Sequence, residues 1–205
     1  MSPRIAPLPL KEWPGEMREA LAAMRPPEPR HPLPTTDGGR PKALNALGTM
    51  ARYPALTRAY HVFSGHVQYA TTLSVPQRER LVLRVAAVRR CAYEWMQHVV
   101  LARDAGLGDE EIARIAEGPD AADWAPLDRA LLRAVDELLA DAEISDATWE
   151  ALARELDERQ LMDLVFTVGA YDALAMALRT FGVEADDDLL RAVAGGPELE
   201  VEERP

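Results

Sequence analysis

Three side chains that could transfer protons or electrons lie close together in the segment 91–98. The thiol of Cys91, the carboxyl group of Glu94 and the imidazole of His98 are spaced three and four residues apart. In a helix, residues at these offsets share one face, so the sequence predicts a narrow stripe carrying all three groups. The residues that continue this stripe are apolar, which predicts that it faces the core rather than water.

Burial of this stripe would prepare its groups for chemistry near neutral pH. Burial raises the pKa of a carboxyl group and lowers that of a histidine, whereas pairing of the two opposes both shifts. In either case Glu94 and His98 are suited to proton transfer. A buried thiol stays neutral unless a cation lies beside it, and Glu94 is nearer to Cys91 than His98 is. The sequence therefore predicts a poor thiolate at Cys91.

Glu79 is a second acid on an apolar helix face. We expect it to point inward, where His98 or an arginine such as Arg84 would be its partner. Taken singly, these residues also have plain structural interpretations: a core histidine, an acid in the first turn of a helix and a small buried thiol. Tyr93 and Trp95 are typical packing residues, and His66 is a candidate for a pocket wall.

The elements that position these residues are all predicted to be helices. Ser74, Pro76 and Gln77 form a helix-start signal, in which the serine caps and the glutamine reaches back. The helix that follows is apolar on nearly every side, so we expect it at the centre of the core. The expected helices span 16–24, 43–52, about 76–89, 91–105 and 127–139, with others beginning at Pro54 and Asp109 and after Ser145 and Asp157, the last running to about Phe181.

The two ends of the chain differ from this helical part. Residues 1–42 are rich in proline and predict an extended arm that wraps a partner subunit or stays mobile. Residues 43–194 predict a single helical domain, and residues 195–205 an acidic, frayed tail. The segments 91–94 and 169–172 resemble each other, which indicates either two duplicated helical halves or chance in a chain of such composition.

Composition limits the possible functions. The chain has 205 residues, is 48% hydrophobic and carries a net charge of −11, so we expect no nucleic acid as a partner. We see no apolar run approaching the roughly 20 residues that cross a bilayer and no secretion signal, and so expect no membrane partner and a cytoplasmic location. One cysteine excludes an internal disulfide, and no nucleotide, flavin or serine-hydrolase motif occurs.

Glu79, Cys91, Glu94 and His98 together resemble the carboxymuconolactone decarboxylase/alkylhydroperoxidase-D superfamily. Its peroxidase branch has a glutamate, eleven residues, a cysteine, two residues, a second cysteine, three residues and a histidine. Here Glu94 stands in place of the second, peroxide-attacking cysteine, and Cys91 matches the resolving one. The Glu94–His98 pair is similar to the decarboxylase branch. The resemblance spans about residues 44–190 and implies an AhpD-like helical bundle that forms homo-oligomers.

The resemblance implies cofactor-free acid/base chemistry on a small carboxylic acid or lactone. His98 would be the general acid/base and Glu94 would orient it or share its proton, with Glu79 and Tyr93 completing a relay. Arg84 would hold a substrate carboxylate, and Trp95 and His66 would line the substrate pocket. Neither a metal nor an organic cofactor is implied.

Three alternatives remain open. The first is a thiol peroxidase that uses Cys91 with an external thiol, since the chain lacks a dithiol. The second is a non-catalytic helical oligomer in which Glu94 and His98 are only a buried pair. The third is a metal site formed by Glu94, His98 and either Glu79 or His66.

Overall fold

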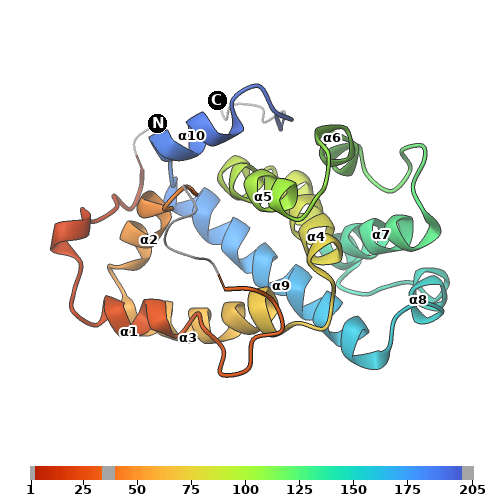
Figure 1. The fold of residues 1–205 in the computed structure, drawn as a ribbon, viewed down its shortest axis with the longest axis horizontal. Coiled ribbons are helices and arrows are strands. Elements are labelled where there is room, and N and C mark those ends of the chain that lie inside the picture. The colour runs from red at the N-terminus through yellow and green to blue at the C-terminus, as the bar shows by residue number, and fades with distance from the viewer. Residues whose placement is uncertain (1–2, 34–39, 200–205) are drawn as a thin grey trace.

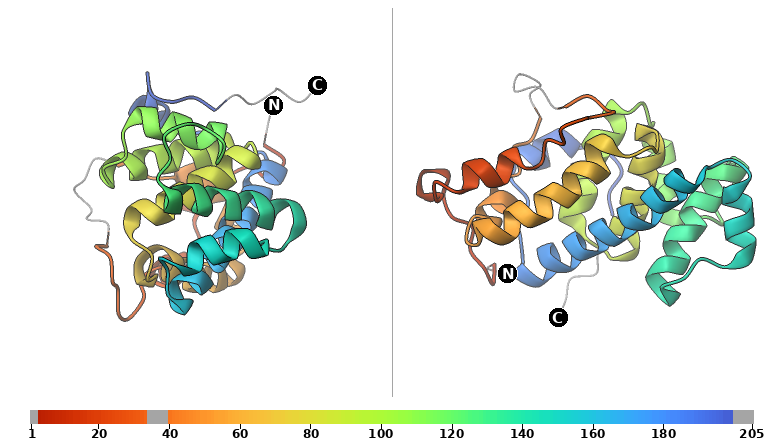
Figure 2. Two further views of the ribbon diagram at one scale, coloured as in Figure 1. Left: turned by 90° about the vertical axis from the view of Figure 1, so that its right-hand side faces the viewer. Right: turned by 90° about the horizontal axis from the view of Figure 1, so that it is seen from below.

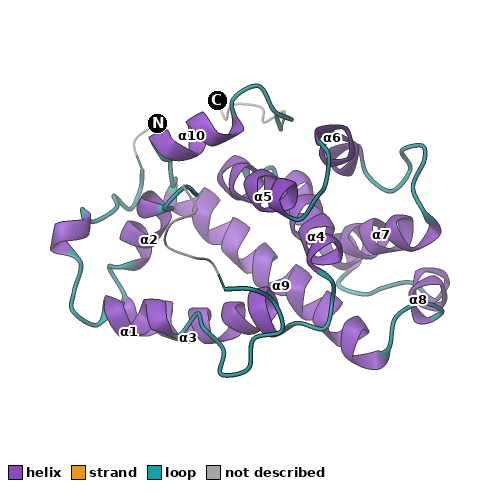
Figure 3. Ribbon diagram, in the orientation of Figure 1, coloured by secondary structure: helices purple, strands orange, loops and turns teal. Residues whose placement is uncertain are grey.

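The protein is an all-helical fold in the computed structural model, which describes residues 3–33 and 40–199. Within these ranges the chain forms ten α-helices and no strand (Figures 1 and 3), which confirms the predicted fold class. The helices are α1 (Met17–Ala22), α2 (Leu44–Met50), α3 (Pro54–Gly65), α4 (Val75–Val88), α5 (Ala92–Asp104), α6 (Asp109–Glu117), α7 (Pro126–Asp141), α8 (Asp146–Ala153), α9 (Glu158–Phe181) and α10 (Asp187–Val193).

Helix α4 lies at the centre of the fold, as its apolar sequence predicts. It begins at the expected capping box, in which the Gln77 amide N–H donates to Ser74 Oγ and the Ser74 N–H donates to Gln77 Oε1. It packs against α5, α6, α7 and α9, and most of its residues between 78 and 86 are buried. Glu79 lies in this buried part of the helix, whereas Val88 at its end is exposed.

A tight turn connects α4 to α5 and sets the position of the predicted stripe. Arg90 adopts a left-handed backbone conformation with φ of 51°, and Cys91 is the residue that precedes the first turn of α5. The turn folds α5 back along α4, so that the two helices pack together over their length. This hairpin brings the stripe of α5 next to Glu79 of α4.

Helix α9 is the longest element and runs along most of the molecule (Figure 2). It is long and apolar enough to cross a bilayer by length and composition alone, which corrects our expectation that no segment meets this test. Half of its most apolar window is buried inside the fold. Its apolar sequence accordingly serves the core, where it packs against α4 and α7.

The described part of the proline-rich arm packs against its own chain. The Leu8 N–H donates to the Gly48 carbonyl of α2, and α1 lies along α3. Two glycines let the backbone of the arm lie this close to α2 and α3. A Cβ atom on Gly48 would lie 2.6 Å from Leu8 O, and one on Gly65 would lie 2.5 Å from Met24 O. Intrachain packing was not among our expectations for the arm.

Three elements were not anticipated from the sequence. A 3₁₀ turn, Leu10–Glu12, lies in the arm, a π-helical turn, His66–Ala70, extends α3, and helix α10 follows a short loop after α9. Residues 34–39 of the predicted arm and 200–205 of the predicted tail lie outside the described residues. The domain boundaries and the duplicated halves remain predictions.

Candidate functional site

The centre of the candidate site is a buried hydrogen-bonded pair between α4 and α5. His98 Nδ1 lies 2.7 Å from Oε2 of Glu79, and both side chains are almost fully buried. Burial alone would raise the pKa of the Glu79 carboxyl group, but the charges and hydrogen bonds of His98 and Arg78 outweigh this effect and lower it. Glu79 is therefore an ionised carboxylate that fixes the orientation of the His98 ring.

Arg78 and Tyr171 complete the surroundings of this pair. Arg78 Nη2 donates to Glu79 Oε1 at 2.7 Å, and its Nη1 donates to the Gln68 carbonyl in the π-helical turn. The ring of Tyr171, from α9, meets the His98 ring edge to face with centroids 4.9 Å apart. The Tyr171 hydroxyl accepts from Gln68 Nε2 at 2.8 Å. The His98 ring is thus held by groups from α4, α9 and the turn.

Glu94 is buried in a different manner from Glu79. Its side chain is 1% exposed, and neither carboxyl oxygen has a hydrogen-bond partner among the described residues. Burial, and secondarily the negative charge of Asp172, raise the pKa of Glu94 well above its ordinary value. Burial therefore favours the protonated, neutral form of the Glu94 carboxyl group. The partner of His98 is Glu79, as one of the two alternatives for Glu79 predicted. The expectation that Glu94 orients the His98 ring is corrected.

Cys91 lies in the same interior region but has properties unlike those of a reactive thiol. It is 1% exposed and packs with Ala46, Ala175 and Leu178. Burial, followed by the negative charge of Glu94, raises the pKa of Cys91 to about 12. A thiol with this pKa is almost entirely protonated at neutral pH, as the sequence led us to expect.

An apolar cavity of about 360 Å³ lies near this buried region, and residues that contact the site, rather than Glu79, Cys91, Glu94 and His98 themselves, line it. Tyr60 of α3 lines the cavity. Burial raises the pKa of its phenol, and the nearby Glu94 carboxyl group adds to this effect when it is ionised. The walls also include Ala46 and Leu178, which pack against Cys91. The cavity has space for a small organic molecule with an apolar body.

Arg84 and Tyr93 were predicted to belong to the site but point elsewhere. The Arg84 guanidinium makes two hydrogen bonds to Asp136 of α7, at 2.6 and 2.8 Å, and others to carbonyl groups of α6. The Tyr93 hydroxyl donates to Asp186 Oδ2 at 2.8 Å, near the start of α10. Their partners, which are distant in sequence, fix both side chains away from the Glu79–His98 pair.

Trp95 and His66, predicted to line a substrate pocket, occupy two other places. Trp95 is buried among residues of α4, α6 and α7, and its indole N–H donates to the Pro197 carbonyl at 3.0 Å. His66 Nε2 lies 2.9 Å from Asp163 Oδ1 and faces a large cleft between the arm, α3 and α9. His66 is thus not a neighbour of Glu94 and His98 in a metal site, and no group of three metal-ligating side chains converges within residues 3–33 and 40–199.

Three participants in the site were missed at the sequence level. Arg78 directly precedes Glu79 in sequence. Neighbouring residues of a helix point in different directions, so a hydrogen bond from Arg78 to Glu79 was not predicted. Tyr171 and Asp172 fall within the segment that resembles 91–94, and this similarity was the available signal. They lie on α9, where Tyr171 meets His98 and Asp172 acts on the Glu94 carboxyl group.

Comparison with known proteins supports the motif-based resemblance. Residues 54–137, from α3 into α7, match the model of the carboxymuconolactone decarboxylase family. This segment contains Glu79, Cys91, Glu94 and His98. No curated protein sequence matches the chain significantly.

Solved structures share the fold at low sequence identity. The alkylhydroperoxidase AhpD core of an uncharacterised peroxidase-related protein from Ralstonia eutropha JMP134 superimposes with a TM-score of 0.64, is 20% identical, and the match covers 80% of this chain and 95% of that one. The debrominase Bmp8 superimposes with a TM-score of 0.70 at 13% identity, covering 92% of this chain and 95% of that one. A cysteine-to-alanine variant of Bmp8 was solved with 2,3,4-tribromopyrrole.

Proposed function

Because the chain belongs to the carboxymuconolactone decarboxylase/AhpD-like superfamily, we propose that it is a cofactor-free enzyme that decarboxylates or isomerises a small carboxylic acid or lactone. Glu94 is the proton donor, and His98, held by Glu79, is the second acid/base group. The substrate occupies the apolar cavity beside Tyr60.

The unpartnered carboxyl group of Glu94 is the observation that carries this proposal. A buried polar group without a hydrogen bond costs about 1–3 kcal/mol of stability, and an ionised one costs more. An apolar residue of similar size would avoid this cost. Glu94 destabilises the folded state and has a strongly raised pKa, and a group with both properties is a candidate for catalysis.

The two carboxyl groups of the site have environments that assign them different roles. Glu79 is ionised because Arg78 and His98 surround it, whereas Glu94 is neutral because it is buried without a partner. A neutral acid can supply a proton where negative charge develops on a substrate carbon. An ionised carboxylate on His98 Nδ1 stabilises the imidazolium that forms whenever His98 accepts a proton. Glu94 is thus suited to donate a proton, and His98, held by Glu79, is suited to accept one.

The apolar cavity fits the requirement of this chemistry for a water-poor environment. In a decarboxylation the carbon–carboxylate bond breaks, CO₂ leaves and the electron pair forms an enolate, which takes a proton from Glu94. Water then returns the proton to Glu94. Excluding water until this point protects the enolate intermediate and strengthens the interactions with the acid.

Turnover of a panel of small lactone carboxylates and keto acids tests the proposal. We expect release of CO₂ or exchange of a substrate C–H with deuterium from solvent. Glu94→Gln should lower kcat about 100-fold or more, the usual effect of a general acid. Cys91→Ser is the matched variant from the same helix end and should retain activity. Equal activity of the Glu94→Gln and unmodified enzymes would refute the role of Glu94.

The likeness to a peroxidase-related protein favours a second candidate function, a thiol peroxidase at Cys91. This function needs a thiolate that reaches the peroxide, whereas Cys91 is buried and its pKa is raised to about 12. Hydroperoxide consumption with dithiothreitol as reductant separates the two functions, because only the peroxidase loses activity on Cys91→Ser. If neither assay shows turnover, a non-catalytic helical scaffold is the better assignment.

A further inference from the structure

A large open cleft lies outside the buried site, between the N-terminal arm and the helices α3 and α9. Its volume is about 970 Å³. One wall is the π-helical turn His66–Ala70, and π-helical distortions occur often at functional sites. The same turn contacts Arg78 and Tyr171 from its other side through Gln68, so the cleft and the buried site are separate.

Positive charge is concentrated in this cleft although the chain is acidic overall. Four arginines line it, Arg25, Arg30, Arg58 and Arg159, against two acids. Among the described residues none of the four guanidinium groups forms an ion pair. This contrasts with Arg80, Arg84 and Arg89, each of which has a carboxylate partner. The cleft therefore presents uncompensated cations to any molecule that enters it.

One of the two acids is already hydrogen-bonded to its neighbours. Asp163 Oδ2 accepts from the amide and the hydroxyl of Thr72, both at 2.6 Å, and its Oδ1 lies 2.9 Å from His66. The carboxylate is thus committed to the wall, which leaves Glu28 as the second acid of the lining. The net charge of the cleft is positive.

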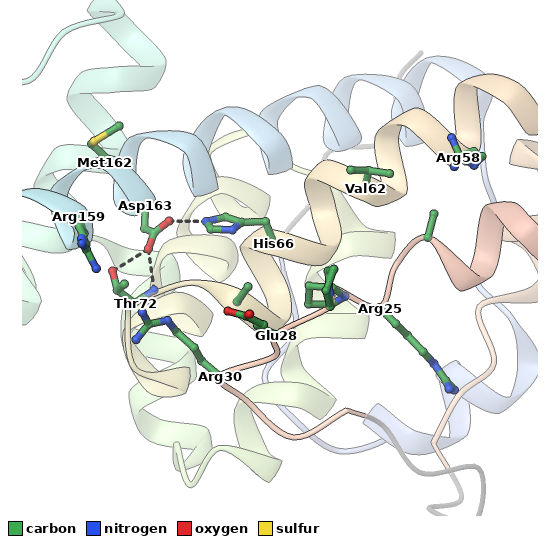
Figure 4. A pocket seen from close by; sticks show the side chains of 14 residues that line it. Arg25, Glu28, Arg30, Arg58, Val62, His66, Thr72, Arg159, Met162 and Asp163 are labelled. Carbon is green, nitrogen blue, oxygen red and sulfur yellow. Dashed lines mark hydrogen bonds and ion pairs between the residues drawn. The ribbon is translucent and has the colours of Figure 1, made fainter.

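The arginines are distributed so that they define two ends. Figure 4 shows the guanidinium groups of Arg30 and Arg159 directed toward the part of the cleft at Thr72, with Arg58 farther along α3. Val62 lies between these ends and is 56% exposed, whereas Met162 lies near Arg159 and is 61% exposed (Figure 4). Apolar surface next to cationic groups fits a ligand with an apolar body and acidic ends.

We infer that this cleft binds an elongated organic dianion, one acidic group of which is held between Arg30 and Arg159 while the other extends toward Arg58. Arginine suits this role because its planar guanidinium binds carboxylate and phosphate oxygens through paired hydrogen bonds. The ligand's carbon chain would cover Val62 and Met162. This inference does not depend on the chemistry proposed for Glu94.

Isothermal titration of the full chain with octanedioate tests the inference. We expect one molecule bound per chain, at least about fivefold more tightly than octanoate, which has the same chain length and a single carboxylate. Arg30→Gln and Arg159→Gln should each weaken octanedioate binding by about 5- to 10-fold. Arg154→Gln removes the same charge from an exposed position outside the cleft and is the control.

The results separate a built site from general attraction of anions. Equal affinity for octanoate and octanedioate, equal effects of Arg154→Gln and Arg159→Gln, or no detectable octanedioate binding would each overturn the inference. Circular dichroism of each variant checks folding, which these exposed positions should not disturb. Glu94→Gln should bind octanedioate as the unmodified protein does, so failure of the proposed enzyme function leaves this test unaffected.

Discussion

His98 Nδ1 lies 2.7 Å from Glu79 Oε2, and this bond joins α5 to α4 in the interior of the fold. Arg78 binds the other oxygen of the same carboxylate, so three ionisable groups share one buried site. Glu94, one turn from His98 on α5, has no such support. The chemistry proposed for the protein rests on this difference between the two glutamates.

Loss of the Glu79 charge should destabilise the protein strongly. Glu79→Gln leaves Arg78 and His98 buried without their carboxylate, and breaking a buried ion pair in this way typically costs about 3–5 kcal/mol. Urea unfolding at pH 7 measures the change, and Glu110→Gln, at an exposed position of α6, is the matched control. A cost for Glu79→Gln no larger than that of the control would contradict the structural role of the pair.

Lowering the pH should destabilise the unmodified protein for the same reason that Glu79→Gln does, because acid protonates the Glu79 carboxylate. Because the pKa of Glu79 is lower in the folded state than its ordinary value of 4.5, the folded state binds fewer protons there than the unfolded chain. The stabilisation by Glu79 is therefore present above about pH 4.5 and is lost as the pH falls through the lowered pKa. Unfolding free energies of the Glu79→Gln variant should lack this contribution to acid sensitivity.

Glu94 should give the opposite pH dependence. Its pKa is raised in the folded state, so between its ordinary value of 4.5 and its folded value the native protein binds the extra proton. Stability should thus decrease as the pH rises through this range, by up to about 1.4 kcal/mol per pH unit. Glu94→Gln should abolish this slope and be more stable than the unmodified protein at pH 8. Parallel stability profiles of the two proteins would show that Glu94 does not titrate in this range.

Cys91 should be inert in the folded protein. Its pKa of about 12 compares with an ordinary value of 9.0, which corresponds to about a thousandfold less thiolate at pH 8. Iodoacetamide should therefore label native protein about a thousandfold more slowly than protein unfolded in urea, and mass spectrometry measures both rates on the single cysteine. Labelling of the native thiol as fast as the unfolded one would revive the peroxidase assignment.

The apolar cavity should determine which substrates react. Ala177 lines it from α9, and the phenyl group of Ala177→Phe would occupy part of its volume of about 360 Å³. We expect KM for any substrate found in the panel to rise at least about tenfold, because lost space displaces the ligand. Ala153→Phe, at an exposed position on α8, is the control and should leave KM unchanged. Unchanged kinetics in Ala177→Phe would place the substrate elsewhere.

Local signals made much of the helical architecture predictable from the sequence. The capping box at Ser74, the cap at Asp157 and the all-round apolar pattern of α4 each depend on residues within a few positions of one another. Helix α10 and the π-helical turn were missed because each is short and lacks a strong pattern of its own. Contacts with distant parts of the chain stabilise them, such as that between Asp186 and Tyr93.

The members of the site on α4 and α5 were predictable, and His98 was one of two partners expected for Glu79, but the isolation of Glu94 was not predicted. Helical spacing places Glu94 and His98 on one face, yet it does not say which carboxylate of the neighbouring helix will approach the ring. The crossing of α4 and α5 brought Glu79 to His98 and left Glu94 alone. Arg84 was misplaced for the same reason, since its partner Asp136 is 52 residues away in sequence.

Measurement of the Glu94 pKa in the native protein tests the central claim most directly. Carboxyl-detected ¹³C NMR of protein labelled at glutamate resolves this group when spectra of the Glu94→Gln variant identify its signal. We predict a carboxylic acid that stays protonated at neutral pH, with a titration midpoint well above 4.5. A midpoint near 4.5 would mean that Glu94 is an ordinary carboxylate, and its role as proton donor would have to be abandoned.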